Sequence, residues 1–147
     1  MTSITHSISI NCPVQQVFDF VSNFENDKYW WEAVIETQKL TPGPIGVGTE
    51  FDELTKVLFV RVQNHLRVTK HQPPTLICYR NESPQLSYDL EYHFAPEQNG
   101  TTFTLVATLE FKGALRLLFP IAMSTLHGQL DRSFDILKRH LESHAQA

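Results

Sequence analysis

The sequence predicts an α+β domain in which a curved antiparallel sheet of about seven strands carries a long C-terminal helix over its concave face. Two short helices are expected near the N-terminus. Three observations support this fold class. Apolar and polar residues alternate in several stretches, as in half-buried strands. Turn-forming residues separate these stretches at short intervals. After Gly113 the apolar spacing changes to three and four residues, which indicates an amphipathic helix.

The first forty residues predict a strand, two short helices and a second strand. SITHSISI alternates and reads as a strand with one apolar face. Pro13 suits the first turn of a helix, and the apolar residues after it follow helical spacing up to Phe24. The run Glu25-Asn26-Asp27 is rich in residues that favour the start of a helix. YWWEAVIETQKL then passes from a short helix into a strand.

The two tryptophans of the chain are adjacent, at positions 30 and 31. Side chains of neighbouring residues on an α-helix point about 100° apart. Trp31 would share a face with Phe24 and with Val34 or Ile35. We therefore expect Trp31 to pack inward and Trp30 to lie at the rim or under a loop. A helix of only one turn would allow the reverse arrangement.

The middle of the chain predicts a run of antiparallel strands. TPGPIGVG holds two prolines and three glycines in residues 41–48 and marks a loop. The dipeptide Asn99-Gly100 between alternating stretches predicts a hairpin. Alternation in the last two stretches indicates a sheet with one apolar face and one solvated face. The expected strands cover residues 49–58, 60–70, 76–81, 86–95 and 101–112.

A long amphipathic helix is expected over residues 114–144. Its apolar residues recur every three or four positions. Pro120 should kink or restart it, because proline lacks the N–H that a helix interior requires. Gly128 should loosen it.

Composition limits the possible functions. The 147 residues suit a single domain spanning 1–147, and the net charge of −4 with scattered basic residues argues against nucleic-acid binding. Two cysteines without a CxxC spacing give no zinc or disulfide signal. No signal peptide or long apolar stretch is visible, so we expect a cytoplasmic protein without an integral membrane segment, either a monomer or a homodimer. Nucleotide, nucleophile and metal motifs are missing, and the sequence predicts no cofactor and no metal.

The order of elements resembles the START/Bet v 1-like (SRPBCC) superfamily, and most closely its polyketide cyclase/dehydrase-like branch. The resemblance is carried in order by SISINCPVQQVFDFVSNFEND, WWEAVIETQKLTPGPIGVGTEF, VTKHQPPTLICYR, YHFAPEQNGTTFTL and LRLLFPIAMSTLHGQLDRSFDILKRHLE. It implies the helix-grip fold and a cavity under the long helix. Members generally bind hydrophobic small molecules or lipids there. Some are cyclases and others have no catalytic activity, and no single catalytic signature transfers to this chain.

A cavity between a curved sheet and a straight helix would be lined by inward-facing apolar and aromatic side chains. The same side chains could instead fill the interior completely, because protein interiors pack densely. The expected ligand-binding residues are Trp31, Phe51, Tyr88, Tyr92, Phe103, Leu105, Phe119, Ala122, Leu126 and Leu130.

Three polar residues on inward-facing positions form a candidate catalytic set. A buried Glu53 would have a raised pKa and could carry a proton. Asn64 and Tyr92 would orient a substrate carbonyl. The alternative for Glu53 is a solvated position near a strand end. The sequence thus leaves three functions open: a carrier or sensor of a hydrophobic molecule, a cyclase or dehydratase acting on a polyketide-like substrate, and an interaction module that docks its long helix on a partner.

Overall fold

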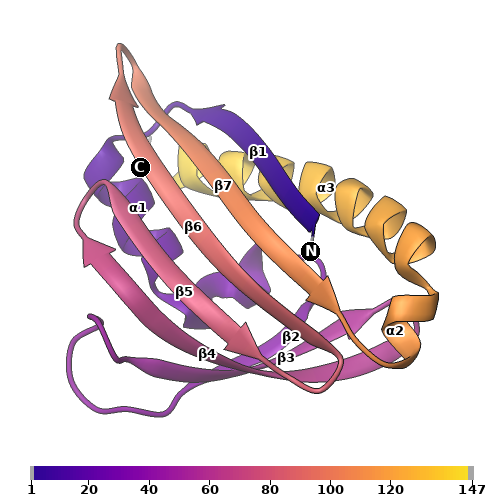
Figure 1. Ribbon diagram of the computed structural model, residues 1–147. Helices are drawn as coiled ribbons and strands as arrows, with labels where there is room; N and C mark the ends of the chain where they lie inside the picture. The colour runs from indigo at the N-terminus through magenta and orange to yellow at the C-terminus, as the bar shows by residue number, and fades with distance from the viewer. Residues whose placement is uncertain (1, 146–147) are drawn as a thin grey trace.

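The computed structural model describes residues 2–145 and consists of one antiparallel sheet, short helices near the N-terminus and a long helix at the C-terminus (Figure 1). The strands are β1 (Thr2–Ile10), β2 (Val34–Lys39), β3 (Glu50–Val57), β4 (Val60–Gln72), β5 (Leu76–Glu82), β6 (Leu86–Glu97) and β7 (Gly100–Phe111). The helices are α1 (Val14–Ser22), the 3₁₀ helix η1 (Phe24–Tyr29), α2 (Ala114–Leu117) and α3 (Phe119–Ala145). The predicted fold class is confirmed.

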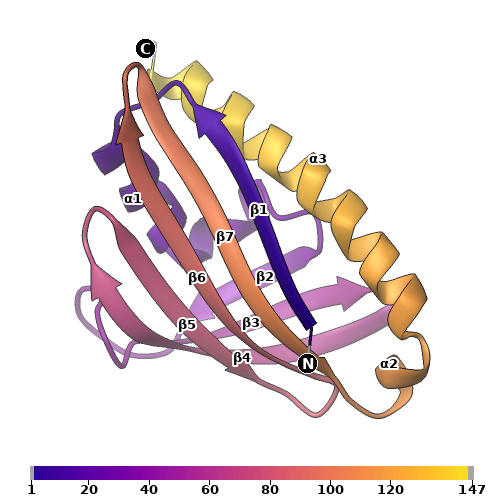
Figure 2. The same cartoon turned by 45° about the horizontal axis from the view of Figure 1, so that its top comes forward.

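The seven strands follow the order β1-β7-β6-β5-β4-β3-β2, and each neighbouring pair is antiparallel. After β1, the chain crosses to the opposite edge through the N-terminal helices and then returns strand by strand. Figures 1 and 2 show the sheet bending strongly, so that β2, β3 and β4 turn beneath the other strands. The long helix α3 runs across the concave side, close to β1.

Alternation along the strands places the core on the concave face. In β7, every second residue from Thr101 to Phe111 is buried. In β3, the same alternation buries Phe51, Glu53 and Thr55 and leaves Asp52 and Leu54 only partly buried. The period of two thus carries polar side chains into the interior together with apolar ones.

The C-terminal helix is interrupted where the sequence predicts. The short helix α2 ends at Leu117, and α3 begins at Phe119 with Pro120 in its first turn. Proline is tolerated there because the first N–H groups of a helix have no intrahelical acceptor. The prediction that Pro120 restarts the helix is therefore correct. None of the helices within residues 2–145 is both long and apolar enough to cross a lipid bilayer.

The prediction for the tryptophans is wrong for Trp30, which is buried with 1% of its surface exposed. The segment before it is a 3₁₀ helix with three residues per turn, and not an α-helix. This period places Phe24, Asp27 and Trp30 on one buried face. Trp31 is half-buried beside this face.

Candidate functional site

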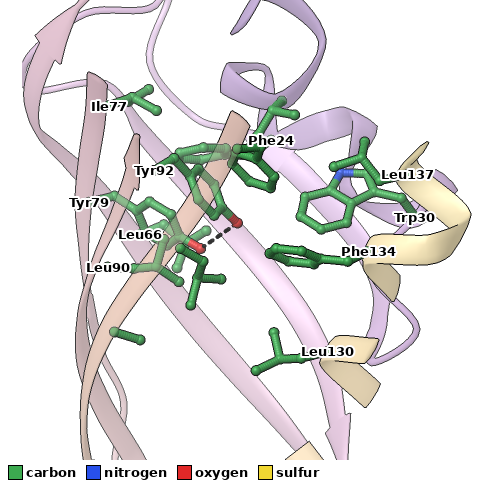
Figure 3. Close-up of a cluster of buried hydrophobic side chains, with 14 of the residues drawn as sticks. Phe24, Trp30, Leu66, Ile77, Tyr79, Leu90, Tyr92, Leu130, Phe134 and Leu137 are labelled. Atoms are coloured by element: carbon green, nitrogen blue, oxygen red, sulfur yellow. Dashed lines mark hydrogen bonds between the residues drawn. The ribbon is translucent and has the colours of Figure 1, made fainter. Parts of the chain in front are cut away.

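An aromatic cluster fills one half of the space between the sheet and α3 (Figure 3). Phe103 is central: its ring centroid lies 5.1 Å from that of Phe134, 5.2 Å from Tyr92 and 6.2 Å from Trp30. Phe24 packs against Phe51 at 4.9 Å. These rings are essentially without solvent exposure. This half of the interior is solid, as close packing requires.

The other half of the space is hollow. A cavity of about 100 Å³ lies under the first half of α3, between that helix and residues of all seven strands. Its walls are mostly apolar, as in ligand pockets generally. Six of the ten residues predicted to bind a ligand line it: Trp31, Tyr88, Leu105, Ala122, Leu126 and Leu130.

The other four predicted ligand-binding residues do not line the cavity. Phe51, Tyr92 and Phe103 belong to the aromatic cluster, because they lie nearer the α1 and η1 end of the interior, where rings from several elements fill the space. Phe119 is half-buried and packs edge-on against Phe111, which itself lines the cavity. Sequence alternation identified the inward face correctly but did not distinguish the filled half from the hollow half.

The wall formed by β3 is polar. Glu53 lines the cavity with 3% of its surface exposed, and its Oε2 accepts a hydrogen bond of 2.8 Å from the Thr37 hydroxyl on β2. The carboxyl of Asp27, from η1, lies beside that of Glu53 and is completely buried. Neither Asp27 oxygen receives a hydrogen bond from an N–H or hydroxyl group in the described part of the chain.

The ionisation of this carboxyl pair is displaced from its ordinary range. Burial raises the pKa of Asp27 far above its usual value, and the neighbouring Glu53 raises it further. Burial also raises the pKa of Glu53, although hydrogen bonds from Asp27 and Thr37 oppose this rise. A protonated Asp27 has an O–H that can donate to Glu53, which removes the problem of two facing acceptors. We therefore assign the shared proton to Asp27.

Asn64 also lines the cavity, but its amide is already engaged. Its Nδ2 donates to the Thr55 hydroxyl at 2.9 Å, and its Oδ1 accepts from Asn81 Nδ2 at 2.9 Å. Asn81 donates further to the Leu86 carbonyl at 2.8 Å. This buried ladder joins β3, β4 and β5 and satisfies polar groups that the core would otherwise leave unpaired.

The three residues of the candidate catalytic set do not converge. Glu53 and Asn64 line the cavity, whereas Tyr92 stands in the aromatic cluster. The Tyr92 hydroxyl accepts a hydrogen bond of 3.0 Å from Trp31 Nε1 and lies 3.4 Å from the Tyr79 hydroxyl. Tyr92 thus holds the Trp31 indole in place at the cavity wall.

The segment after η1 is fastened to α3 beside the cavity. The Glu32 backbone N–H donates to the buried Ser133 hydroxyl at 2.9 Å. The Glu32 carboxylate also receives two hydrogen bonds from the Arg132 guanidinium, at 2.6 and 3.1 Å. These contacts hold Trp31 and Ala33, which line the cavity, against the helix that covers it.

Sequence reasoning missed Asp27, which it treated as part of a helix start. The signal for its burial was the spacing of three that places Phe24, Asp27 and Trp30 on one side of a 3₁₀ turn. No group of three His, Cys, Asp or Glu side chains within residues 2–145 is arranged to hold a metal ion.

The sequence matches the profile of one protein family across nearly its whole length. Residues 1–142 match the family described as "Polyketide cyclase / dehydrase and lipid transport". No curated protein matches the sequence.

Solved structures share the fold at low sequence identity. A protein of Thermus thermophilus is 15% identical with a TM-score of 0.82, covering 98% of this chain and 99% of that one. A START superfamily protein of Mycobacterium smegmatis is 13% identical with a TM-score of 0.75, covering 98% and 97%. The di-domain ARO/CYC BexL from the BE-7585A biosynthetic pathway is 19% identical with a TM-score of 0.72, covering 99% of this chain and 50% of BexL.

Proposed function

The chain belongs to the polyketide cyclase/dehydrase and lipid transport family, and on this premise we propose that it binds a hydrophobic small molecule or lipid between the sheet and α3. The observation that carries the proposal is the cavity beneath the first half of α3. A sequence selected only for stability would be expected to fill such a space, because each void removes dispersion contacts from the core.

The size of the cavity limits what it holds without rearrangement. About 100 Å³ is well below the roughly 300–1,000 Å³ of typical ligand pockets. It suits a compound with a single ring. A longer ligand requires α3 to move away from β3, or side chains such as Leu126 to change rotamer.

A binding experiment with cavity-filling variants tests the proposal. Ala122 on α3 and Ala107 on β7 line the cavity from different walls. Ala122→Phe and Ala107→Leu should each lower the affinity for propylbenzene at least about tenfold, because the new side chain occupies the ligand's volume. Binding is followed by NMR of the Trp31 indole N–H. Ala95→Phe, at an exposed position of β6, is the matched control and should bind as the wild type does.

Unchanged affinity in both cavity-filling variants would contradict binding at this place. Loss of affinity in Ala95→Phe as well would show that the effect comes from adding a large apolar side chain anywhere and not from filling the cavity.

A second candidate function is a cyclase or dehydratase acting on an aromatic or polyketide-like substrate. It is favoured by the Glu53 carboxyl at the cavity wall, with Asp27 behind it as a proton source. In the dehydration of a β-hydroxy ketone, Glu53 would remove the proton next to the carbonyl. A proton would return to the departing hydroxyl, which leaves as water.

The aldol adduct of benzaldehyde and acetone tests this second function, because its dehydration product, benzalacetone, absorbs in the ultraviolet. Glu53→Gln should abolish turnover and keep the affinity for propylbenzene, which has no hydrogen-bonding group, within about twofold of the wild type. Turnover that survives in Glu53→Gln, or that is absent from the wild type, would contradict the enzyme hypothesis for this substrate and leave the binding proposal standing.

A further inference from the structure

The charges around the cavity indicate the chemical class of the molecule that it holds. We infer that the cavity selects an uncharged ligand with a hydroxyl or similar hydrogen-bond donor, and that it rejects carboxylates and phosphates. This inference rests on the proposed function, since it states which hydrophobic compounds the cavity accepts.

The rejection of anions follows from the lining residues. Among the described residues that line the cavity, none is Lys, Arg or His, and the only carboxyl group is that of Glu53. Asp27 lies directly behind Glu53. A buried anion is costly unless a cation or several hydrogen-bond donors compensate it. A ligand carboxylate would find no cation on these walls and would lie next to the acidic Glu53 side chain.

The preference for a donor follows from the hydrogen bonds already made. Glu53 accepts hydrogen bonds from the Thr37 hydroxyl and from the protonated Asp27, and its two oxygens can still accept a further one. Asn64, the next polar side chain across the strand pair, already uses its carbonyl for Asn81 and one N–H for Thr55. A ligand hydroxyl that enters between them can donate to the Glu53 carboxyl. Such a hydrogen bond to an ionised carboxylate is stronger than one between neutral groups.

The rest of the cavity accommodates an apolar body. Leu105, Ala107 and Leu109 of β7 line one wall, and Ala122, Leu126 and Leu130 of α3 line another. A ring between these walls would be desolvated on both faces, with its hydroxyl directed toward β3. The expected ligand is therefore a phenol or an alcohol with a compact hydrophobic body.

Three compounds with the same ring and tail test the inference: para-propylphenol, propylbenzene and para-propylbenzoate. Dissociation constants are measured at neutral pH from the shift of the Trp31 indole N–H in NMR titrations. The phenol should bind about threefold to tenfold more tightly than propylbenzene, and the benzoate at least about tenfold more weakly than the phenol.

Glu53→Gln separates the effect of charge from that of shape, because the side chain keeps its size and an acceptor oxygen. In this variant the benzoate should gain at least about threefold in affinity relative to propylbenzene. Glu36→Gln, an exposed position on β2, is the control and should leave the ranking unchanged.

The outcomes distinguish this inference from the proposed function. Benzoate binding as tight as phenol binding in the wild type overturns the inference while cavity binding stands. If the benzoate gains no affinity relative to propylbenzene in Glu53→Gln, Glu53 is not the group that rejects anions. Failure of all three compounds to bind overturns both proposals.

Discussion

Asp27 and Glu53 meet in the interior, and none of the described residues that shift their pKa values is a Lys, Arg or His. This arrangement affects the stability of the fold in a predictable direction. Because burial raises the pKa of Asp27, the folded protein keeps a proton there at pH values at which the unfolded chain has released it. Unfolding then releases a proton. The free energy of unfolding therefore falls as pH rises above the usual carboxyl pKa, and continues to fall up to the folded-state pKa.

Asp27→Asn should flatten this decline, because asparagine cannot ionise and its amide can still donate to Glu53. One fully coupled proton changes the free energy of unfolding by about 1.4 kcal/mol per pH unit. Between about pH 5 and pH 8 we expect the wild type to lose at least 1 kcal/mol more than the variant. Urea denaturation at a series of pH values measures both slopes.

Glu97→Gln, at an exposed position near the end of β6, is the control for this experiment and should keep the slope of the wild type. A slope in Asp27→Asn as steep as that of the wild type would show that Asp27 does not hold the proton in the folded state.

At the scale of residues, the sequence predicted the direction in which a side chain points better than it predicted the residues that the side chain contacts. Alternation along β3 correctly predicted that Glu53 points inward. It could not reveal Asp27 beside it, because that contact joins η1 to β3 and depends on a 3₁₀ geometry instead of an α-helical one. The same difference in helix period explains why Trp30, and not Trp31, is the more deeply buried indole.

At the scale of elements, α3 contains a glycine that its neighbours allow to be replaced. A Cβ on Gly128 would lie 3.2 Å from Arg132 Nη1, so this exposed side chain, which is paired with Glu32, must move by only a few tenths of an ångström. In a helix interior, alanine gives a fold that is more stable than glycine does by about 0.5–1 kcal/mol. We expect Gly128→Ala to raise the free energy of unfolding by about that amount in urea denaturation.

Gly113 is the contrasting position and should respond with the opposite sign. It joins β7 to α2 at φ +58° and ψ −134°, a conformation that L-residues rarely adopt. Gly113→Ala should lower the free energy of unfolding by about 1–3 kcal/mol. If Gly128→Ala destabilised the protein equally, the Arg132 side chain would be more constrained than its exposure indicates.

The contact between the Glu32 N–H and the Ser133 hydroxyl fixes the segment before β2 against α3. Ser133→Ala leaves this part-buried N–H without its acceptor, so the free energy of unfolding should fall by about 0.5–1.5 kcal/mol. Hydrogen exchange at the Glu32 amide should speed up accordingly. Ser124→Ala, on an exposed face of the same helix, should change neither stability nor that exchange rate.

The elements themselves were largely predictable. Each expected strand between residues 49 and 112 is present, with ends within two residues of the prediction. Pro120 and the change of apolar period after Gly113 located the helix break. These features depend on local periodicity and on proline geometry, which a single sequence displays directly.

At the scale of the whole molecule, a ligand that enters the cavity should stabilise the fold, because the unfolded chain has no such site. At a free concentration one hundred times the dissociation constant, the gain is about 2.7 kcal/mol. With para-propylphenol at one hundred times the wild-type dissociation constant, the midpoint of thermal unfolding should rise for the wild type and rise clearly less for Ala122→Phe, because a tenfold weaker affinity leaves only about 1.4 kcal/mol of the gain. An equal rise in both proteins would indicate binding elsewhere.

The cavity could not be located from the sequence alone. Phe103 and Leu105 are neighbours on the same face of β7, yet Phe103 belongs to the solid cluster and Leu105 lines the hollow. Whether an inward-facing residue joins the aromatic cluster or lines the cavity depends on the distance between α3 and that part of the curved sheet. That distance is set by packing across the whole interior, and no local pattern encodes it.

The two indoles have an optical consequence. Trp30 and Trp31 are the only tryptophans, and their ring centroids lie 4.9 Å apart at an angle of 32°. Electronic transitions of chromophores this close couple, so circular dichroism should display an exciton couplet whose amplitude follows their mutual orientation. Trp30 is buried in the core, whereas Trp31 lines the cavity. A ligand that tilts the Trp31 indole would therefore change the amplitude of that couplet. The circular dichroism of the protein should therefore report whether the cavity is occupied.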